Sequence, residues 1–159
     1  MPSRRSKSLG RRLIHFVAFG FGAGYARYAP GTCGTLVAVP IYLLLREFGW
    51  LAYALVTLAM FVLGIWLCGV AERDLGKSDA PGIVWDEIVG YLISMFMAPA
   101  GWLWVGIGFA LFRLFDIVKP FPIGLLDKRI GGGFGVMLDD VLAGIYSWMV
   151  MYFIVALLA

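Results

Sequence analysis

Charged residues are scarce in this sequence. They make up 14% of its 159 residues, whereas about 25% is usual in a soluble domain. Hydrophobic residues make up 62%, and a soluble fold of this size leaves too much of its surface exposed to hide so many. The composition therefore excludes an intrinsically disordered chain and indicates an integral membrane protein.

Cysteine and histidine are also rare. Cys33 and Cys68 form no CxxC pair, so we expect two reduced packing residues and no disulfide scaffold. The one histidine, His15, stands alone near a basic segment, which disfavours histidine-based phosphatase chemistry and favours a core or interfacial role. The sequence also lacks a Walker A loop, a Cys-x5-Arg loop, an Asp-x-Asp-x-Thr motif and an Asp-Gly-x2-Ala-Arg motif. These absences exclude several familiar phosphate chemistries.

The net charge of +3 is concentrated in residues 1–12, which form a basic arm. Because the chain is so apolar, nucleic acid is not an expected partner. We expect instead a mobile arm on the cytoplasmic side, near anionic lipid headgroups. No repeat or long linker divides the chain, so residues 1–159 are predicted to form a single membrane-embedded domain.

Four apolar regions are candidates for membrane helices: residues 35–45, 50–71, 88–112 and 141–159. The second and fourth reach the ~20 residues that a span requires, whereas the first is short unless its helix begins earlier or is re-entrant. The third is interrupted at Pro99 and Gly101, so it forms either one long span or two helices, over 84–98 and 102–118.

The distribution of charge favours two helices there. Of the 23 charged residues (13 basic and 10 acidic), all but Arg46 and Glu47 lie before residue 35, within 72–87 or within 113–140. Two hairpins would place these three segments on one membrane face, which the positive-inside rule makes cytoplasmic. We therefore expect an all-α, polytopic membrane protein of about five helices, arranged as two hairpins plus a C-terminal span, with its active site at the cytoplasmic face.

Two pairs of adjacent carboxylates stand where apolar helices begin. Asp86 and Glu87 open one helix, and Asp139 and Asp140 follow a glycine-rich stretch that we expect to be a flexible loop. Burying such a pair without compensation is costly, and a magnesium ion with oxygen ligands would compensate it. The alternative is an exposed acidic first turn, which the helix dipole favours.

Two other motifs suit a phosphate group. Arg113, Asp116 and Lys119 are spaced to fall on one broad helical face, where the cations could hold a phosphate. Snorkelling at the membrane interface is the alternative. Thr32 and Thr35 stand in a Gly/Thr-rich segment before an apolar helix, where hydroxyls and a helix N-terminus could contact an anion or act as an ordinary cap.

Together these motifs resemble the phosphatidylglycerophosphatase A family. The matching stretches are PGTCGTLVAVP (30–40), IVWDEIVG (83–90), FRLFDIVKPFPI (112–123) and GGFGVMLDDVLAG (132–144), in the family's order. The resemblance implies a multi-pass, magnesium-dependent lipid phosphatase of the bacterial inner membrane. Its substrate among the membrane lipids would be phosphatidylglycerophosphate, and its products phosphatidylglycerol and phosphate.

The resemblance also carries over a set of site residues, to which we assign roles. The predicted magnesium ligands are Asp86, Glu87, Asp139 and Asp140, with Asp116 as a further catalytic acid; the predicted phosphate ligands are Thr32, Thr35, Arg113 and Lys119. Glu72 and Asp74 are weaker candidates, because they stand in an ordinary charged segment. The alternative function is a transporter or channel for a cation or phosphate, in which the acids would line a path.

Overall fold

The computed structural model describes residues 9–158, and every regular element within them is helical. The elements are α1 (Leu9–Ala18), η1 (Ala23–Tyr25), α2 (Pro30–Leu45), η2 (Arg46–Phe48), α3 (Trp50–Leu75), α4 (Trp85–Ser94), α5 (Trp102–Val118), α6 (Ile123–Arg129) and α7 (Gly132–Leu158). Three helices are long and apolar enough to cross a membrane: Pro30–Phe48, Trp50–Leu75 and Gly132–Leu158. The fold is thus all-α, as expected, with the character of a membrane protein.

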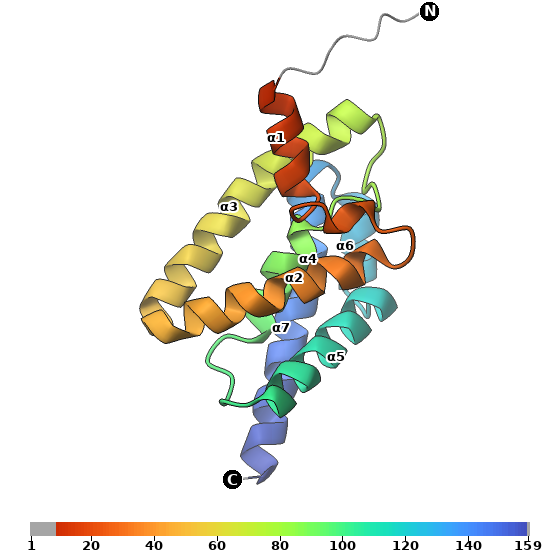
Figure 1. Ribbon diagram of the computed structural model, residues 1–159. Helices are drawn as coiled ribbons and strands as arrows, with labels where there is room; N and C mark the ends of the chain where they lie inside the picture. The colour runs from red at the N-terminus through yellow and green to blue at the C-terminus, as the bar shows by residue number, and fades with distance from the viewer. Residues whose placement is uncertain (1–8, 159) are drawn as a thin grey trace, which may run out of the picture.

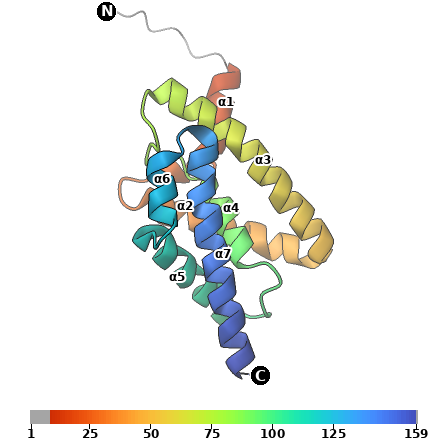
Figure 2. The same ribbon diagram turned by 180° about the vertical axis from the view of Figure 1, so that it is seen from behind.

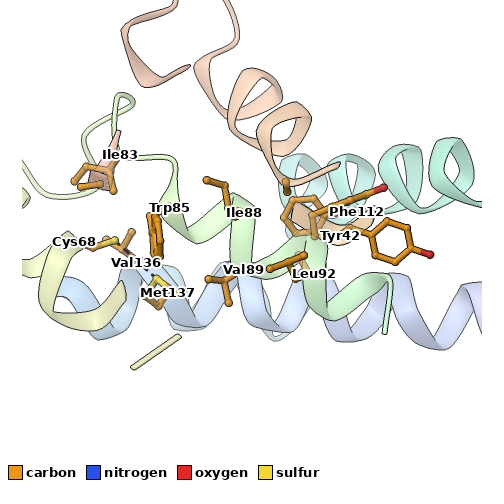
Figure 3. Close-up of a cluster of buried hydrophobic side chains, with 14 of the residues drawn as sticks. Tyr42, Cys68, Ile83, Trp85, Ile88, Val89, Leu92, Phe112, Val136 and Met137 are labelled. Carbon is orange, nitrogen blue, oxygen red and sulfur yellow. Dashed lines mark hydrogen bonds between the residues drawn. The ribbon is translucent and has the colours of Figure 1, made fainter. Parts of the chain in front are cut away.

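The short helix α4 lies at the centre of the molecule, enclosed by α2, α3, α5 and α7 (Figures 1 and 2). Eight of its ten residues are buried. Ile88, Val89 and Leu92 join Phe112 of α5 and Met137 of α7 in one buried cluster (Figure 3). Within a bilayer such a cluster stabilises the fold through close van der Waals packing, since lipid is as apolar as the side chains.

Helices α4 and α7 approach each other closely at two glycines. A Cβ atom on Gly144 of α7 would overlap the carbonyl oxygen of Gly90 in α4. A Cβ atom on Gly90 would stand 2.5 Å from the Phe112 ring and 2.7 Å from the Asp140 carbonyl oxygen. Small residues let membrane helices come this close, and here they bring the acidic first turn of α4 beside the acidic pair of α7.

The C-terminal end of α4 stops inside the molecule, where its carbonyl groups need partners. The Tyr53 hydroxyl of α3 donates to the Leu92 carbonyl at 2.7 Å, and the Ser94 hydroxyl donates to the Tyr91 carbonyl at 2.7 Å. The Trp148 indole of α7 donates to the Phe96 carbonyl at 3.1 Å. These side chains allow a ten-residue helix to end away from water.

The expected number of five helices is wrong, because α1 and α6 also form. Residues 9–12, expected in the mobile arm, begin α1, which packs on α3 and buries His15 and Ala18. Residues 1–8 of that arm lie outside the described residues. Helix α6 forms within the charged segment 113–140 and buries Ile123 while packing on α7.

The break in the third apolar region is confirmed, but its first helix is shorter than predicted. Helix α5 has the predicted bounds, whereas α4 ends at Ser94 instead of continuing to residue 98. The backbone at Met97 has φ of 56°, which a right-handed helix does not allow. At 1.5 Å per residue, α4 is about 15 Å long, half of what a bilayer core requires. It therefore does not cross a membrane by itself.

The glycine-rich stretch before Asp139 is not a flexible loop. Helix α7 begins at Gly132, so Gly133 and Gly135 are helical, and both are buried. A Cβ atom on Gly133 would overlap the Ile65 carbonyl oxygen and stand 2.6 Å from the Gly69 nitrogen of α3. These glycines therefore serve close packing of α7 against its neighbours, which holds the acidic pair firmly in place.

Candidate active site

All four sequence motifs meet at one cavity of about 270 Å³. Its walls come from the start of α2, the segment between α3 and α4, the first turn of α4, the last turns of α5, and α7. The lining residues are Ala29, Pro30, Gly31, Asp79, Pro81, Ile83, Asp86, Glu87, Arg113, Asp116, Lys119, Asp139 and Asp140. The fold thus joins segments separated by up to about a hundred residues of sequence.

Three carboxylates from two helices form the acidic part of this cavity. Asp86 and Glu87 of α4 and Asp140 of α7 each offer an oxygen, and these oxygens lie within 4.8 Å of one another. One oxygen of each residue (Asp86 Oδ1, Glu87 Oε2 and Asp140 Oδ2) is buried without a hydrogen-bond partner. Such orphaned acceptors are costly unless a further group satisfies them.

The raised pKa values of the two acids of α4 also indicate that a further group, such as a cation, is needed at this cluster. Burial raises the pKa of Asp86 well above its usual range, and the adjacent Glu87 raises it further. Burial and the nearby Asp140 raise the pKa of Glu87 to about 8. A bound cation would stabilise the ionised carboxylates at neutral pH. Hard oxygen donors around a small buried space are the ligands that magnesium or a similar divalent ion takes, so these three residues could hold a metal ion.

Asp139, predicted as a magnesium ligand, is not in this group of three. Its Oδ2 accepts a hydrogen bond from Lys119 Nζ at 2.6 Å, and its Oδ1 is buried without a partner. Lys119 also lies 3.2 Å from Asp127 Oδ2 of α6. These two carboxylates raise the pKa of Lys119, although partial burial acts to lower it. Lys119 therefore stays charged and fixed at the edge of the cavity.

Arg113 stands between two acids of the cavity. Its Nη1 forms an ion pair with Asp116, one turn further along α5, and lies 4.0 Å from Glu87 Oε1. Its Nε is buried and has no hydrogen-bond partner. The guanidinium is therefore oriented by its neighbours and retains a donor that an anionic ligand could use.

The Gly/Thr-rich segment forms the first turns of α2, with Pro30 as the first helical residue. A Cβ atom on Gly31 would overlap Glu87 Oε1 and stand 3.0 Å from Arg113 Nη1, so glycine allows this helix start to reach the cavity wall. Thr32 and Thr35 do not line the cavity. Thr35 is buried, and its hydroxyl donates to the Gly31 carbonyl at 2.9 Å.

Two further acids lie at or next to the site without having been predicted. Asp79 lines the cavity from an irregular segment, where its backbone N–H donates to Glu72 Oε1 at 2.7 Å. Asp127 contacts Lys119 from α6. Neither had a recognisable signal, since one stands in a turn and the other beside Lys128 and Arg129 in an ordinary polar stretch.

The remaining predicted residues lie elsewhere. Glu72 accepts hydrogen bonds from Ser78 and Asp79, so it holds the segment after α3. Asp74 pairs with Arg11 and His15 of α1 and is not part of the cavity wall. Both cysteines are free, as expected, and the Cys68 thiol contacts Met137.

Comparison with known proteins finds bacterial relatives over most of the chain. Two bacterial proteins named phosphatidylglycerophosphatase A are similar over most of their length: that of Escherichia coli is 40% identical over 141 residues (88% of this chain, 82% of the relative), and that of Haemophilus influenzae is 44% identical over 141 residues (87% and 86%). A Bacteroides thetaiotaomicron protein, provisionally named a phosphatidylinositol-3-phosphatase, is 42% identical over 144 residues (85% and 89%).

No solved structure is significantly similar to this chain. The sequence model of the family described as phosphatidylglycerophosphatase A matches residues 16–155. This range contains all four motifs and every residue of the cavity wall. The chain belongs to the phosphatidylglycerophosphatase A family.

Proposed function

We propose that this protein hydrolyses the terminal phosphomonoester of phosphatidylglycerophosphate, releasing phosphatidylglycerol and inorganic phosphate. The observation that carries the proposal is the meeting of a buried acidic cluster with two cations in one cavity. The names of the two relatives that are 40% and 44% identical support this substrate.

The metal in this proposal is Mg²⁺, held by Asp86, Glu87 and Asp140. Their orphaned oxygens supply the hard donors that the ion prefers. When bound, the ion would neutralise phosphate charge and lower the pKa of a water molecule. Asp139, first predicted as a fourth ligand, instead has the role of fixing Lys119 through its Oδ2, and Asp116 that of orienting Arg113.

Arg113 and Lys119 bind the phosphate of the substrate in this mechanism. Arg113 offers its unpartnered Nε, and the Lys119 ammonium has a third donor beyond those directed at Asp139 and Asp127. Because their neighbours already fix both cations, little reorganisation is needed when negative charge develops in the transition state. The first turn of α2 adds its helix dipole at Gly31, and the Thr35 hydroxyl stabilises that turn by donating to the Gly31 carbonyl.

The substrate is a membrane lipid, and the fold suits a site at a membrane surface. Asp139 and Asp140 stand about 10 Å along α7 from its start at Gly132, at 1.5 Å per residue. The acyl chains of the substrate would stay in the bilayer while its headgroup enters the cavity. We place this face on the cytoplasmic side of the bacterial inner membrane, because of the basic residues near it.

The test is phosphate release by the purified protein in detergent, from short-chain phosphatidylglycerophosphate, in a Mg²⁺ titration and in EDTA. Phosphatidylinositol 3-phosphate and glycerol 3-phosphate serve as comparison substrates. We expect Mg²⁺-dependent release that is fastest with phosphatidylglycerophosphate. Faster release from phosphatidylinositol 3-phosphate would contradict the substrate assignment. Absence of release, together with ion or phosphate flux in proteoliposomes, would favour the transporter alternative.

A further inference from the structure

Helix α1 presents an apolar stripe that the rest of the described structure leaves uncovered. Leu9, Leu13 and Phe16 recur at helical spacing and are 74%, 56% and 47% exposed. Phe21 and Tyr25, just after the helix, are also exposed, and the Phe16 and Phe21 rings meet edge to face at 6.0 Å. Exposed aromatic and aliphatic side chains beside basic residues are typical of helices that lie in a membrane interface.

The orientation of α1 is fixed by the body of the protein. Asp74 of α3 accepts from Arg11 Nη1 at 2.7 Å, and its other oxygen lies 3.0 Å from His15 Nε2. His15 and Ala18 are buried on the same side of the helix. Arg11 is therefore engaged in an ion pair with α3, whereas the neighbouring Arg12 lines a different part of the surface.

A cavity of about 440 Å³, separate from the active-site cavity, lies where α1 meets η1. It is lined by Arg12, Leu13, His15, Phe16 and Tyr25, and it shares no residue with the active-site cavity. Among the described residues, Arg12 makes no ion pair. The cavity thus combines a cation, a phenol hydroxyl and apolar walls that continue onto the exposed stripe.

We propose that this cavity binds one anionic phospholipid, separate from the substrate. Its phosphate would lie against Arg12 and the Tyr25 hydroxyl, and an acyl chain would follow Leu13 and Phe16. Charge complementarity selects this occupant, because a guanidinium binds a phosphodiester in a planar, two-pronged manner. A purely apolar partner would leave Arg12 without a counter-charge.

The site has a structural connection to the active-site wall. Val84 N–H donates to the Ala18 carbonyl at 3.0 Å, and a Cβ atom on Gly82 would overlap the Phe19 ring. Pro81 and Ile83, on either side of Gly82, line the active-site cavity. A lipid bound at α1 would therefore rest against the element that supports the segment between α3 and α4.

The experiment is native mass spectrometry of the full chain in detergent, titrated with dioleoylphosphatidylglycerol or dioleoylphosphatidylcholine. We expect the wild type to retain one phosphatidylglycerol in preference to phosphatidylcholine. One basic side chain near anionic lipid is worth about 1 kcal/mol, so Arg12→Gln should weaken that binding about fivefold, and Arg12→Lys should largely restore it. Asp86→Asn, which alters the active site, should keep the preference and so separates the two sites.

The matched control is Arg73→Gln, which removes one exposed arginine from the last turn of α3. We expect it to change phosphatidylglycerol binding less than twofold. Equal losses in Arg12→Gln and Arg73→Gln would overturn the proposal in favour of diffuse charge attraction. Equal retention of the two lipids by the wild type would also overturn it, and this measurement needs no variant. A lipid-free dimer would show instead that the stripe packs against a second copy of the chain.

Discussion

Lys119 and Asp139 form a direct ion pair, with Lys119 Nζ donating to Asp139 Oδ2 at 2.6 Å. The lysine is the capping residue that directly follows α5, and the aspartate lies about two turns into α7. The pair therefore fixes the cationic motif against the acidic motif. It also gives Asp139 a role different from that of Asp140, which lies with Asp86 and Glu87.

Neutralising one acid of the three-carboxylate cluster should abolish most activity. We expect Asp86→Asn and Asp140→Asn each to lower kcat at least about a hundredfold, because a lost ligand removes several kcal/mol of metal-assisted stabilisation. The measurement is phosphate release across a Mg²⁺ titration. Glu47→Gln, at an exposed acid in η2 far from the cavity, is the control and should behave as the wild type. Near-normal activity of either aspartate variant would remove that residue from the metal site.

Magnesium should stabilise the fold itself. A ligand that binds only the folded state stabilises it by about 2.7 kcal/mol at a hundred times its Kd, and here it also relieves repulsion among buried carboxylates. We expect the thermal unfolding midpoint in detergent to rise on replacing EDTA by MgCl₂. The rise should shrink in Asp140→Asn but persist in Glu47→Gln. An equal rise in all three proteins would indicate nonspecific stabilisation.

Replacing Arg113 by lysine, the other common cationic residue, should lower activity. Arg113→Lys retains the charge but not the fork that reaches both Asp116 and a phosphate. Loss of a charge-assisted hydrogen bond of 1.5–3 kcal/mol predicts a fall in kcat/KM of roughly ten- to a hundredfold. Kinetics of Arg113→Lys, Lys119→Arg and both alanine variants, with folding checked by circular dichroism, test this. Wild-type kinetics in both alanine variants would exclude this helical face from the active site.

The close approach of α4 and α7 should not tolerate a methyl group. Gly144→Ala would place a Cβ atom against the Gly90 carbonyl oxygen, and overpacking of this kind typically costs about 1–3 kcal/mol. We expect a lower thermal midpoint and reduced activity. Gly106→Ala in α5 is the matched control, since no atom lies within 4 Å of its added Cβ. Equal stability of the two variants would contradict the packing argument.

The membrane topology can be tested by labelling cysteines from outside intact cells. On a Cys33→Ser background, Glu47→Cys should react, because η2 ends the first candidate span at the turn that leads into α3. Lys77→Cys, in the segment after α3, should be protected until the cells are permeabilised. Cys68 is buried and should contribute little background. Labelling of position 77 without labelling of position 47 would reverse the predicted orientation.

The sequence alone determined the all-α fold class and identified most of the residues that meet in the cavity. Apolar composition and long hydrophobic runs indicate a helical membrane protein, because runs of about 20 apolar residues match membrane helices, whereas the strands of a barrel are about half as long. The break at Pro99 and Gly101 was readable because proline and glycine act locally. Asp86, Glu87, Arg113 and Asp140 were identifiable because charges at the ends of apolar helices are costly unless they have a function.

Only the tertiary structure decided which of the charged side chains contact one another. The pairing of Lys119 with Asp139 and the position of Asp79 depend on contacts between distant segments, which no local pattern encodes. The length of α4 also depends on tertiary contacts. The hydropathy of the sequence predicts a helix to residue 98, but α4 ends at Ser94, where side-chain hydroxyls donate hydrogen bonds to its last carbonyl groups. Tertiary contacts also decide the role of the glycines before Asp139, whose sequence suggests flexibility. The lack of a side chain at Gly133 instead lets α7 pack closely against α3. This packing fixes the segment, and a sequence pattern does not show it because it depends on a neighbouring helix.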